Sequence, residues 1–109
     1  KDATIDPPPP RSYAYCSDTI FDPRIAEYIR NVDLLYHETT FLQQHIERAG
    51  ATYHTTAAQA AEIARLAGAR RLLMGHYSAR YPNLDMFLEE AEKIFPNCLL
   101  ATDGKKIEI

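Results

Sequence analysis

Cysteine is scarce in this chain: Cys16 and Cys98 are the only two among 109 residues. Two cysteines so far apart in sequence provide neither a disulfide framework nor a CxxC metal motif. We therefore expect both to be free, buried thiols, as is usual for cysteines in a reducing compartment.

Long apolar runs are also missing, because no stretch reaches the ~18 apolar residues that a membrane helix needs. The opening "KDATIDPPPPRS" has no apolar core and so is not a signal peptide. We expect a cytoplasmic protein. Residues 1–11 should form an extended proline-rich lead-in, and residues 12–109 a single domain. Because no initiator Met is present, we expect a fragment or a processed product.

Basic residues are not in excess, since 12 Lys and Arg stand against 15 Asp and Glu, for a net charge of -3. This balance excludes a protein that binds nucleic acid mainly through a large basic surface. It does not exclude a local phosphate site, because one or two arginines suffice to hold a phosphate.

Strand-like and helix-like segments alternate along the rest of the chain. Asp22 followed by Pro23 is a helix start signal, Thr55 or Thr56 can cap a later helix, and Gly68 is a stop signal. The alternation predicts an α/β architecture with largely parallel strands. The expected strands are 12–16, 33–38, 70–76 and a terminal pair at 98–102 and 105–109; the expected helices are 24–32, 40–50, 57–67 and 82–96.

Polar side chains follow three of the expected strands where each apolar run ends. They are Asp18, His37 with Glu38, and His76. In open α/β sheets, ligands bind at the carboxyl edge of the strands. We therefore expect these groups to converge on one rim of the sheet.

His76 alone would be unremarkable, because a histidine at a strand end often has a purely structural role. Ser78 and Arg80 follow it, and both are suited to binding phosphate. Arg80 without His76 would be read as an ordinary surface arginine.

Two carboxylates are candidates for metal chemistry. Asp18 could cap a helix, but Asp22 already serves that purpose. The carboxylate of Asp18 is therefore available to bridge two metal ions. "HETT" is not the HExxH motif of zinc proteases, because Phe41 stands where the second histidine would be. Glu38 could instead orient another histidine.

His54 lies just before a helix cap, so it is either a capping-loop residue or a proton donor to a leaving oxygen. His45, in the middle of a helical stretch, is expected on the surface.

Five motifs occur in a fixed order: "SDT", "HETT", "HTTAAQAAEIARLAG", "GHYSARY" and "ATDG". Together they resemble the C-terminal part of the ribonuclease Z family, the tRNA 3′-processing endonucleases of the metallo-β-lactamase fold. The resemblance covers residues 12–109. It implies the C-terminal half of an αββα sandwich whose site holds two zinc ions, with manganese or iron as alternatives.

The resemblance also implies a role for particular residues. Asp18 matches the carboxylate that bridges both zincs, and His76 the last histidine ligand. His54 matches the histidine that protonates the leaving 3′ oxygen, with Glu38 supporting it. The segment that holds the scissile phosphate matches Ser78, Arg80 and Tyr81, and a loop lining the same site matches Asp103.

The chain departs from the family pattern in two ways. Thr39-Thr40 replaces the usual Ala-Thr, and Thr55 stands where Ser is common; neither change removes a group that the chemistry needs. The HxHxDH motif, a further histidine ligand and the arm that grips the tRNA are absent. With Asp18 and His76 alone, neither zinc has three protein ligands, so we expect the isolated chain to be inactive.

The implied partners are precursor tRNA, an N-terminal half that covers the open sheet face, and a second copy in a homodimer. Two other functions remain open. The chain could belong to a phosphodiesterase or sulfatase of the same fold, or it could be a non-catalytic interaction module.

Overall fold

The computed structural model describes residues 12–16 and 21–101. The predicted lead-in at 1–11 and the second strand of the terminal pair at 105–109 lie outside the described residues. The same is true of Asp18 and Asp103.

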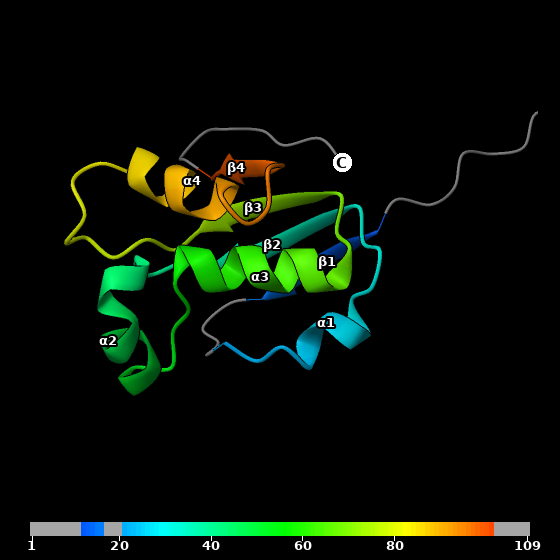
Figure 1. Cartoon of the computed structure of the whole chain (residues 1–109), viewed down its shortest axis with the longest axis horizontal. Coiled ribbons are helices and arrows are strands. Elements are labelled where there is room, and N and C mark those ends of the chain that lie inside the picture. Colours follow the sequence, from blue (N-terminus) through cyan, green and yellow to red (C-terminus); the bar gives the residue numbers. More distant parts are fainter. Residues whose placement is uncertain (1–11, 17–20, 102–109) are drawn as a thin grey trace, which may run out of the picture.

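A four-stranded parallel sheet forms the centre of the described chain (Figure 1). Its strands are paired in the order β1-β2-β3-β4, with His37 beside Cys16 on one side and beside Met74 on the other. The predicted α/β class with parallel strands is confirmed. The strands are β1 (Tyr13–Cys16), β2 (Leu34–Glu38), β3 (Arg71–Gly75) and β4 (Cys98–Leu100).

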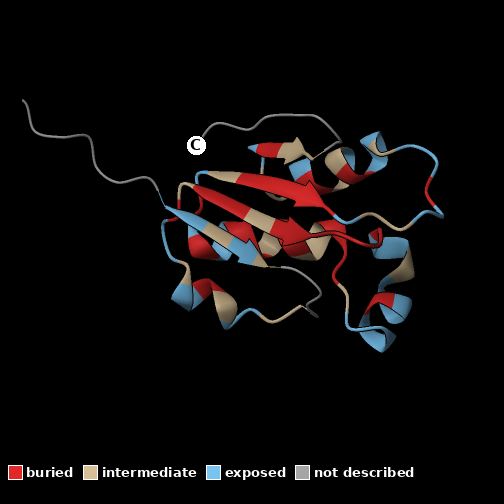
Figure 2. Ribbon diagram, turned by 180° about the vertical axis from the view of Figure 1, so that it is seen from behind, coloured by how far each residue is buried: buried red, intermediate tan, exposed pale blue. Residues whose placement is uncertain are grey.

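The helices gather on one face of this sheet. Parallel strands that follow one another in chain order, with right-handed crossovers, place every crossover helix on the same side. Figure 1 shows α1, α3 and α4 in front of the strands, whereas Figure 2, from behind, shows no described helix over the opposite face. The helices are α1 (Ile25–Tyr28), the 3-10 turn η1 (Gln43–His45), α2 (Ile46–Ala51), α3 (Ala57–Ala67) and α4 (Asp85–Glu92).

Helix α3 is the best specified element of the sequence. Its N-terminus has a capping box, in which the Thr56 hydroxyl accepts from Gln59 N while the Gln59 side chain accepts from Thr56 N. Gly68 ends it with a left-handed φ of 67°. The small alanines on its buried face let the helix lie close to the sheet; they are Ala57, Ala60, Ala61, Ala64 and Ala67.

Alternation along the strands separates the two faces of the sheet. Leu35, Leu72 and Met74 are buried in the core under the helices. On the opposite face, the ring of Tyr15 stacks on the ring of Tyr36, with 4.6 Å between their centroids. Tyr15 is 61% exposed. An exposed aromatic face agrees with the expectation of a half sandwich.

The predicted helix 40–50 is wrong in its first part. Leu42 is extended, and helical structure begins only at η1. The reason is long-range: the Tyr81 hydroxyl accepts from Leu42 N at 3.0 Å, and the Glu90 carboxylate accepts from Gln43 N at 2.9 Å. Phe41 also forms a parallel bridge with Thr56, and this pairing keeps the segment before η1 extended.

Two other helices are shorter than predicted. Helix α1 begins only after Arg24, because Pro23 and Arg24 form a turn; the Asp22 carboxylate accepts from Arg24 N, the bond that a capping residue makes. Asn31, with a left-handed φ of 59°, lies just beyond its end. Helix α4 occupies the middle of the predicted span 82–96.

Both cysteines are free, as predicted; Cys98 is buried and Cys16 is half-buried. Burial and the nearby Glu92 raise the pKa of the Cys98 thiol to about 12. Across the described ranges, no helix has the length and apolar character that a membrane crossing requires.

Candidate active site

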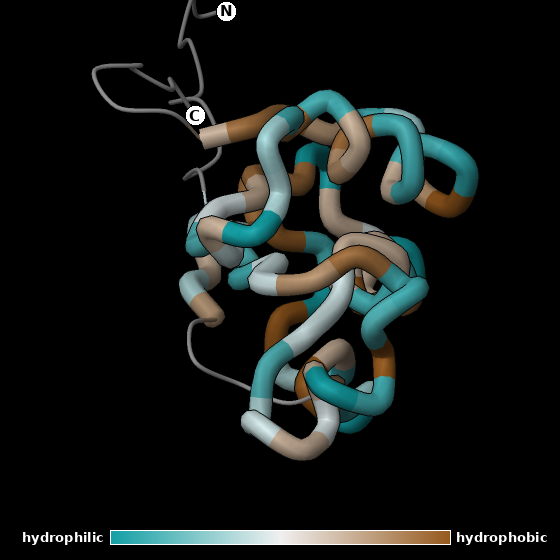
Figure 3. The backbone as a smooth tube through the Cα atoms, turned by 90° about the vertical axis from the view of Figure 1, so that its left-hand side faces the viewer, coloured by the Kyte–Doolittle hydropathy of each residue, from teal (hydrophilic) through white to brown (hydrophobic). Residues whose placement is uncertain are grey.

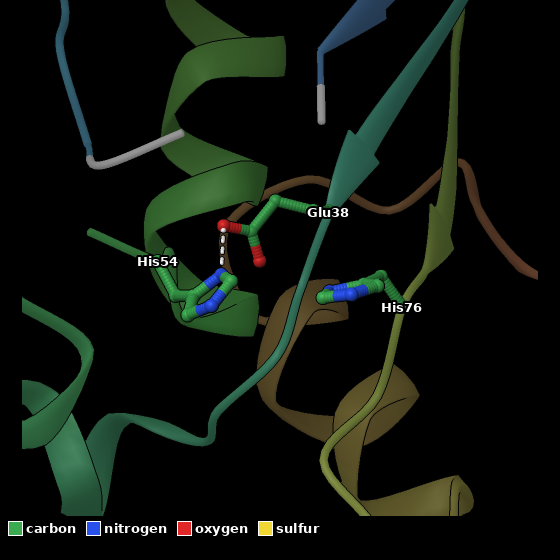
Figure 4. A group of neighbouring side chains, drawn as sticks. All are labelled: Glu38, His54 and His76. Atoms are coloured by element: carbon green, nitrogen blue, oxygen red, sulfur yellow. Dashed lines mark hydrogen bonds and ion pairs between the residues drawn. The ribbon is translucent and has the colours of Figure 1, made fainter. Parts of the chain in front are cut away.

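Three side chains from separate segments converge at the carboxyl edge of the sheet (Figure 4). Glu38 is the last residue of β2, His76 directly follows β3, and His54 lies in the loop before α3. Figure 3 looks toward this edge, where the loops carry both hydrophobic and hydrophilic residues. The predicted convergence of Glu38 and His76 on one rim is confirmed, and His54 joins them.

The Glu38 carboxylate is fully buried and surrounded by hydrogen-bond donors. Oε1 accepts from Thr55 N at 3.0 Å and contacts Nδ1 of His54 at 3.1 Å. Oε2 accepts from Thr40 N at 3.0 Å and from the Thr40 hydroxyl at 2.6 Å. A buried carboxylate is stable only with such partners, so this one is fixed in place.

His54 is oriented by that carboxylate. A carboxylate accepts hydrogen bonds, so the Nδ1 atom of His54 carries the hydrogen in this contact. The imidazole side chain remains 22% exposed. Its other nitrogen, Nε2, is therefore the one available for proton exchange with a bound molecule.

His76 is held in an unusual backbone conformation. Its φ is 59°, in the left-handed region that residues other than glycine seldom adopt. The turn leaves His76 exposed while the next residue, Tyr77, packs 5.0 Å from the Phe87 ring. Such strain is common where a side chain is placed for function.

Together, Glu38, His54 and His76 are a possible metal site, because one ligand atom from each lies within 4.8 Å of the others. Carboxylate and imidazole are suitable ligands for zinc. The two imidazoles fit a metal ion better than Glu38 does. The oxygens of Glu38 already accept four hydrogen bonds, so that side chain acts as a support.

The segment after His76 lies against the same loops. The Ser78 amide donates to the carbonyl oxygen of Thr40 at 2.9 Å. The exposed guanidinium of Arg80 lies over the Phe41 ring, 5.6 Å from its centroid. Phe41 in turn makes an edge contact with His54, at 6.2 Å between centroids. Arg80 and His54 thus contact the same aromatic ring.

The hydroxyl of Tyr81 contacts other residues than those of the site. Tyr81 is buried, and its hydroxyl contacts His45 Nδ1 at 2.6 Å as well as accepting from Leu42 N. His45 was expected on the surface; it is only partly exposed, and its ring is paired with the Tyr81 hydroxyl. The phosphate-binding role predicted for Tyr81 stays a prediction.

Sequence reasoning missed two supporting residues. Thr40 lies between the histidines, and its place in "HETT" directly after the strand was the available signal. Glu90 of α4 was not foreseen at all. Its carboxylate accepts from Gln43 N and from Ala58 N at 2.8 Å, and so ties the loops that carry the site to α4.

His37, the neighbour of Glu38, is buried beneath the site. Its Nδ1 atom donates to the carbonyl oxygen of Glu38 at 2.9 Å. Within the described residues its Nε2 atom has no hydrogen-bond partner. Desolvation lowers the pKa of this imidazole, so the neutral form is favoured in the folded chain.

Comparison with known proteins agrees with this architecture. The family model described as the beta-lactamase superfamily domain matches residues 4–77. The chain belongs to that family, and its four-stranded parallel sheet with helices on one face is a partial metallo-β-lactamase fold.

Among curated relatives, the chain is homologous to ribonuclease Z of Bacteroides fragilis (strain YCH46). The two are 55% identical over 101 residues, which is 93% of this chain and 33% of the relative. The chain thus spans about a third of the length of the curated relatives it matches.

Two solved structures support the fold. The metallo-β-lactamase fold protein YhfI from Bacillus subtilis matches with a TM-score of 0.77 and 26% identity, over 84% of this chain and 37% of that one. A long form of RNase Z from yeast matches with a TM-score of 0.71 and 31% identity, over 82% of this chain and 12% of that one.

Proposed function

We propose that this chain supplies the proton-donating half of the active site of a metal-dependent endoribonuclease that matures the 3′ end of precursor tRNA. The observation that carries the proposal is the Glu38–His54 pair: a fully buried carboxylate holds a partly exposed imidazole by Nδ1 at 3.1 Å. Homology to ribonuclease Z supplies the substrate class.

The proposed reaction is hydrolysis of one phosphodiester. The oxygen of water forms a bond to phosphorus and the bond from phosphorus to O3′ breaks. His54 gives a proton from Nε2 to the leaving O3′, and the attacking water releases one proton to solvent, from which His54 is reprotonated. Arg80 binds the non-bridging phosphate oxygens through its guanidinium. Glu38 holds the imidazole in position while its charge changes, a task that a buried carboxylate performs well.

The proposed metal ligands on this chain are His76 and Asp18, and the proposed metal is zinc, with manganese or iron as alternatives. A bound metal would supply Lewis-acid activation of the attacking water. Because two ligands fall short of a typical catalytic zinc site, we propose that an N-terminal half supplies the others and covers the open sheet face. Homodimerisation and a cytoplasmic location are part of the same proposal.

A chimera tests this function. This chain replaces the matching third of the B. fragilis ribonuclease Z, and the product is assayed on a precursor tRNA and on a small phosphodiester. We expect tRNA cleavage that leaves a 3′ hydroxyl after the discriminator nucleotide. A folded, zinc-loaded chimera that hydrolyses only the small diester would favour the broader phosphodiesterase reading. A chimera that cleaves neither would favour the non-catalytic module.

A further inference from the structure

The hydroxyl of Thr40 touches both histidines and the carboxylate between them. Its Oγ1 atom lies 2.9 Å from Nδ1 of His76 and 3.2 Å from Nδ1 of His54. The same hydroxyl donates to Oε2 of Glu38 at 2.6 Å. Thr40 is 7% exposed, so water competes little for these contacts.

The proton count of this cluster is determined by chemistry. A hydroxyl has one hydrogen and two lone pairs, whereas a carboxylate only accepts. The hydrogen of Thr40 therefore goes to Glu38, and the short distance is typical of a charge-assisted bond. Toward both histidines Thr40 must then accept. Each imidazole consequently carries a hydrogen on Nδ1. In the neutral ring, Nε2 then carries the lone pair.

We propose that Thr40 is a positioning residue that sets the tautomer of His76 and that, together with Glu38, supports the same tautomer in His54. Holding the hydrogen on Nδ1 places the lone pair of His76 on Nε2, the atom that would ligate a metal cation. In His54 it makes Nε2 the atom that exchanges a proton with substrate. The purpose assigned to each Nε2 rests on the proposed function, whereas the tautomers rest only on the hydrogen bonds.

The same network decides how the possible metal site is used. Both Nδ1 atoms and both oxygens of Glu38 are engaged with one another, with Thr40 or with backbone amides. Glu38 therefore acts on a metal indirectly, as the acceptor that orients the Thr40 hydroxyl, which orients His76. A carboxylate commonly supports a metal-bound histidine directly; here a hydroxyl stands between them.

Nitrogen NMR on the whole chain, with histidine labelled by ¹⁵N, reads the tautomers without metal or substrate. Protonated and unprotonated ring nitrogens resonate far apart, so the spectra show which nitrogen of each ring carries the hydrogen. His54→Asn and His76→Asn assign the signals. Thr40→Val removes the hydroxyl, and Thr40→Ser restores it. Thr39→Val is the matched control, because that buried hydroxyl donates to the carbonyl oxygen of Gly75 instead.

We expect Nδ1–H in both histidines of the wild type, of Thr40→Ser and of Thr39→Val. In Thr40→Val we expect His76 to shift toward the Nε2–H form that an isolated side chain prefers. His54 should keep Nδ1–H, because Glu38 still accepts from it. An unchanged His76 in Thr40→Val would overturn the proposal.

The wild-type spectrum is a test in itself should Thr40→Val fail to fold. Nε2–H at His76 in the wild type contradicts the proposal, and Nδ1–H there, kept in Thr40→Ser, supports it. The result is separable from the proposed function. An inactive chimera with the expected tautomers defeats the nuclease reading alone, whereas an active chimera with His76 in the Nε2–H form defeats the role of Thr40 alone.

Discussion

The interior of this chain has two parts built on different principles. Under α3 the core consists of alanines and larger apolar side chains such as Leu35, Leu72 and Phe87. At the carboxyl edge of β2 the interior is polar instead. The buried polar residues of the described chain fall in two short segments, His37–Thr40 and Thr55–Thr56.

The difference teaches where selection for function acts on this fold. Apolar packing needs shape and volume, and many side chains satisfy it. A buried polar cluster must satisfy every donor and acceptor, so each member depends on the others. The apolar part should therefore determine stability, and the polar part should determine chemistry. The following four predictions test that division.

The largest expected effect is on catalysis, at His54. In the chimera, His54→Asn removes the proton donor and should lower the rate of tRNA cleavage by about 10²–10⁴-fold. Because the imidazole is partly exposed, the midpoint of urea unfolding should change little. His45→Asn, at the other half-buried histidine of the described chain, should keep wild-type cleavage. Equal losses in both variants would break the division.

The apolar part should show the largest effect on stability. Phe87 is fully buried and makes ring contacts to Tyr77 and Tyr81 at 5.0 and 5.1 Å. Phe87→Ala should lower the free energy of unfolding by about 3–5 kcal/mol, measured by urea denaturation. A decrease in the free energy of unfolding of less than about 1 kcal/mol would contradict the view that the apolar core under the helices determines stability.

Exchanging the buried carboxylate should cost less stability than opening the core. In Glu38→Gln one oxygen still accepts, but the amide nitrogen faces donors that have lost their acceptor. The expected loss is about 1–3 kcal/mol in the free energy of unfolding. Glu89→Gln, on the exposed side of α4, is the control and should change stability by less than about 0.5 kcal/mol. A Glu38→Gln variant as stable as the control would contradict the described network.

The smallest effect concerns pH and His37. The folded chain holds the pKa of His37 below its ordinary value of about 6.5. The unfolded chain therefore takes up the proton first as pH falls. Stability is present above about pH 6.5 and is lost as pH drops through the folded pKa. Urea unfolding across pH should show a smaller slope for His37→Asn than for the wild type. Identical slopes would refute this role.

Much of the architecture was predictable because it is encoded locally. Apolar runs of strand length, the capping residue Thr56 and the stop at Gly68 each act within a few positions. The convergence of Glu38 and His76 followed from parallel pairing alone. The pairing of Glu38 with His54, in contrast, was inferred from a family resemblance and not from spacing.

What sequence reasoning did not find depends on distant contacts. The helix expected from residue 40 begins late because Phe41 pairs with Thr56 in a parallel bridge, while Tyr81 and Glu90 accept from the amides of Leu42 and Gln43. Those partners lie 39 and 47 positions away, and no local pattern marks them. The central place of Thr40 also becomes visible only when three segments are brought together.

The most direct test of the account is a substrate in which sulfur replaces the leaving O3′ of the scissile bond. A thiolate leaves without a proton, since thiols ionise near a pKa of ~8.5. If His54 protonates the leaving atom, the chimera with His54→Asn should cleave the sulfur substrate about as fast as the unsubstituted chimera, while remaining impaired on the oxygen substrate. An equal loss of rate on both substrates would contradict the role of His54.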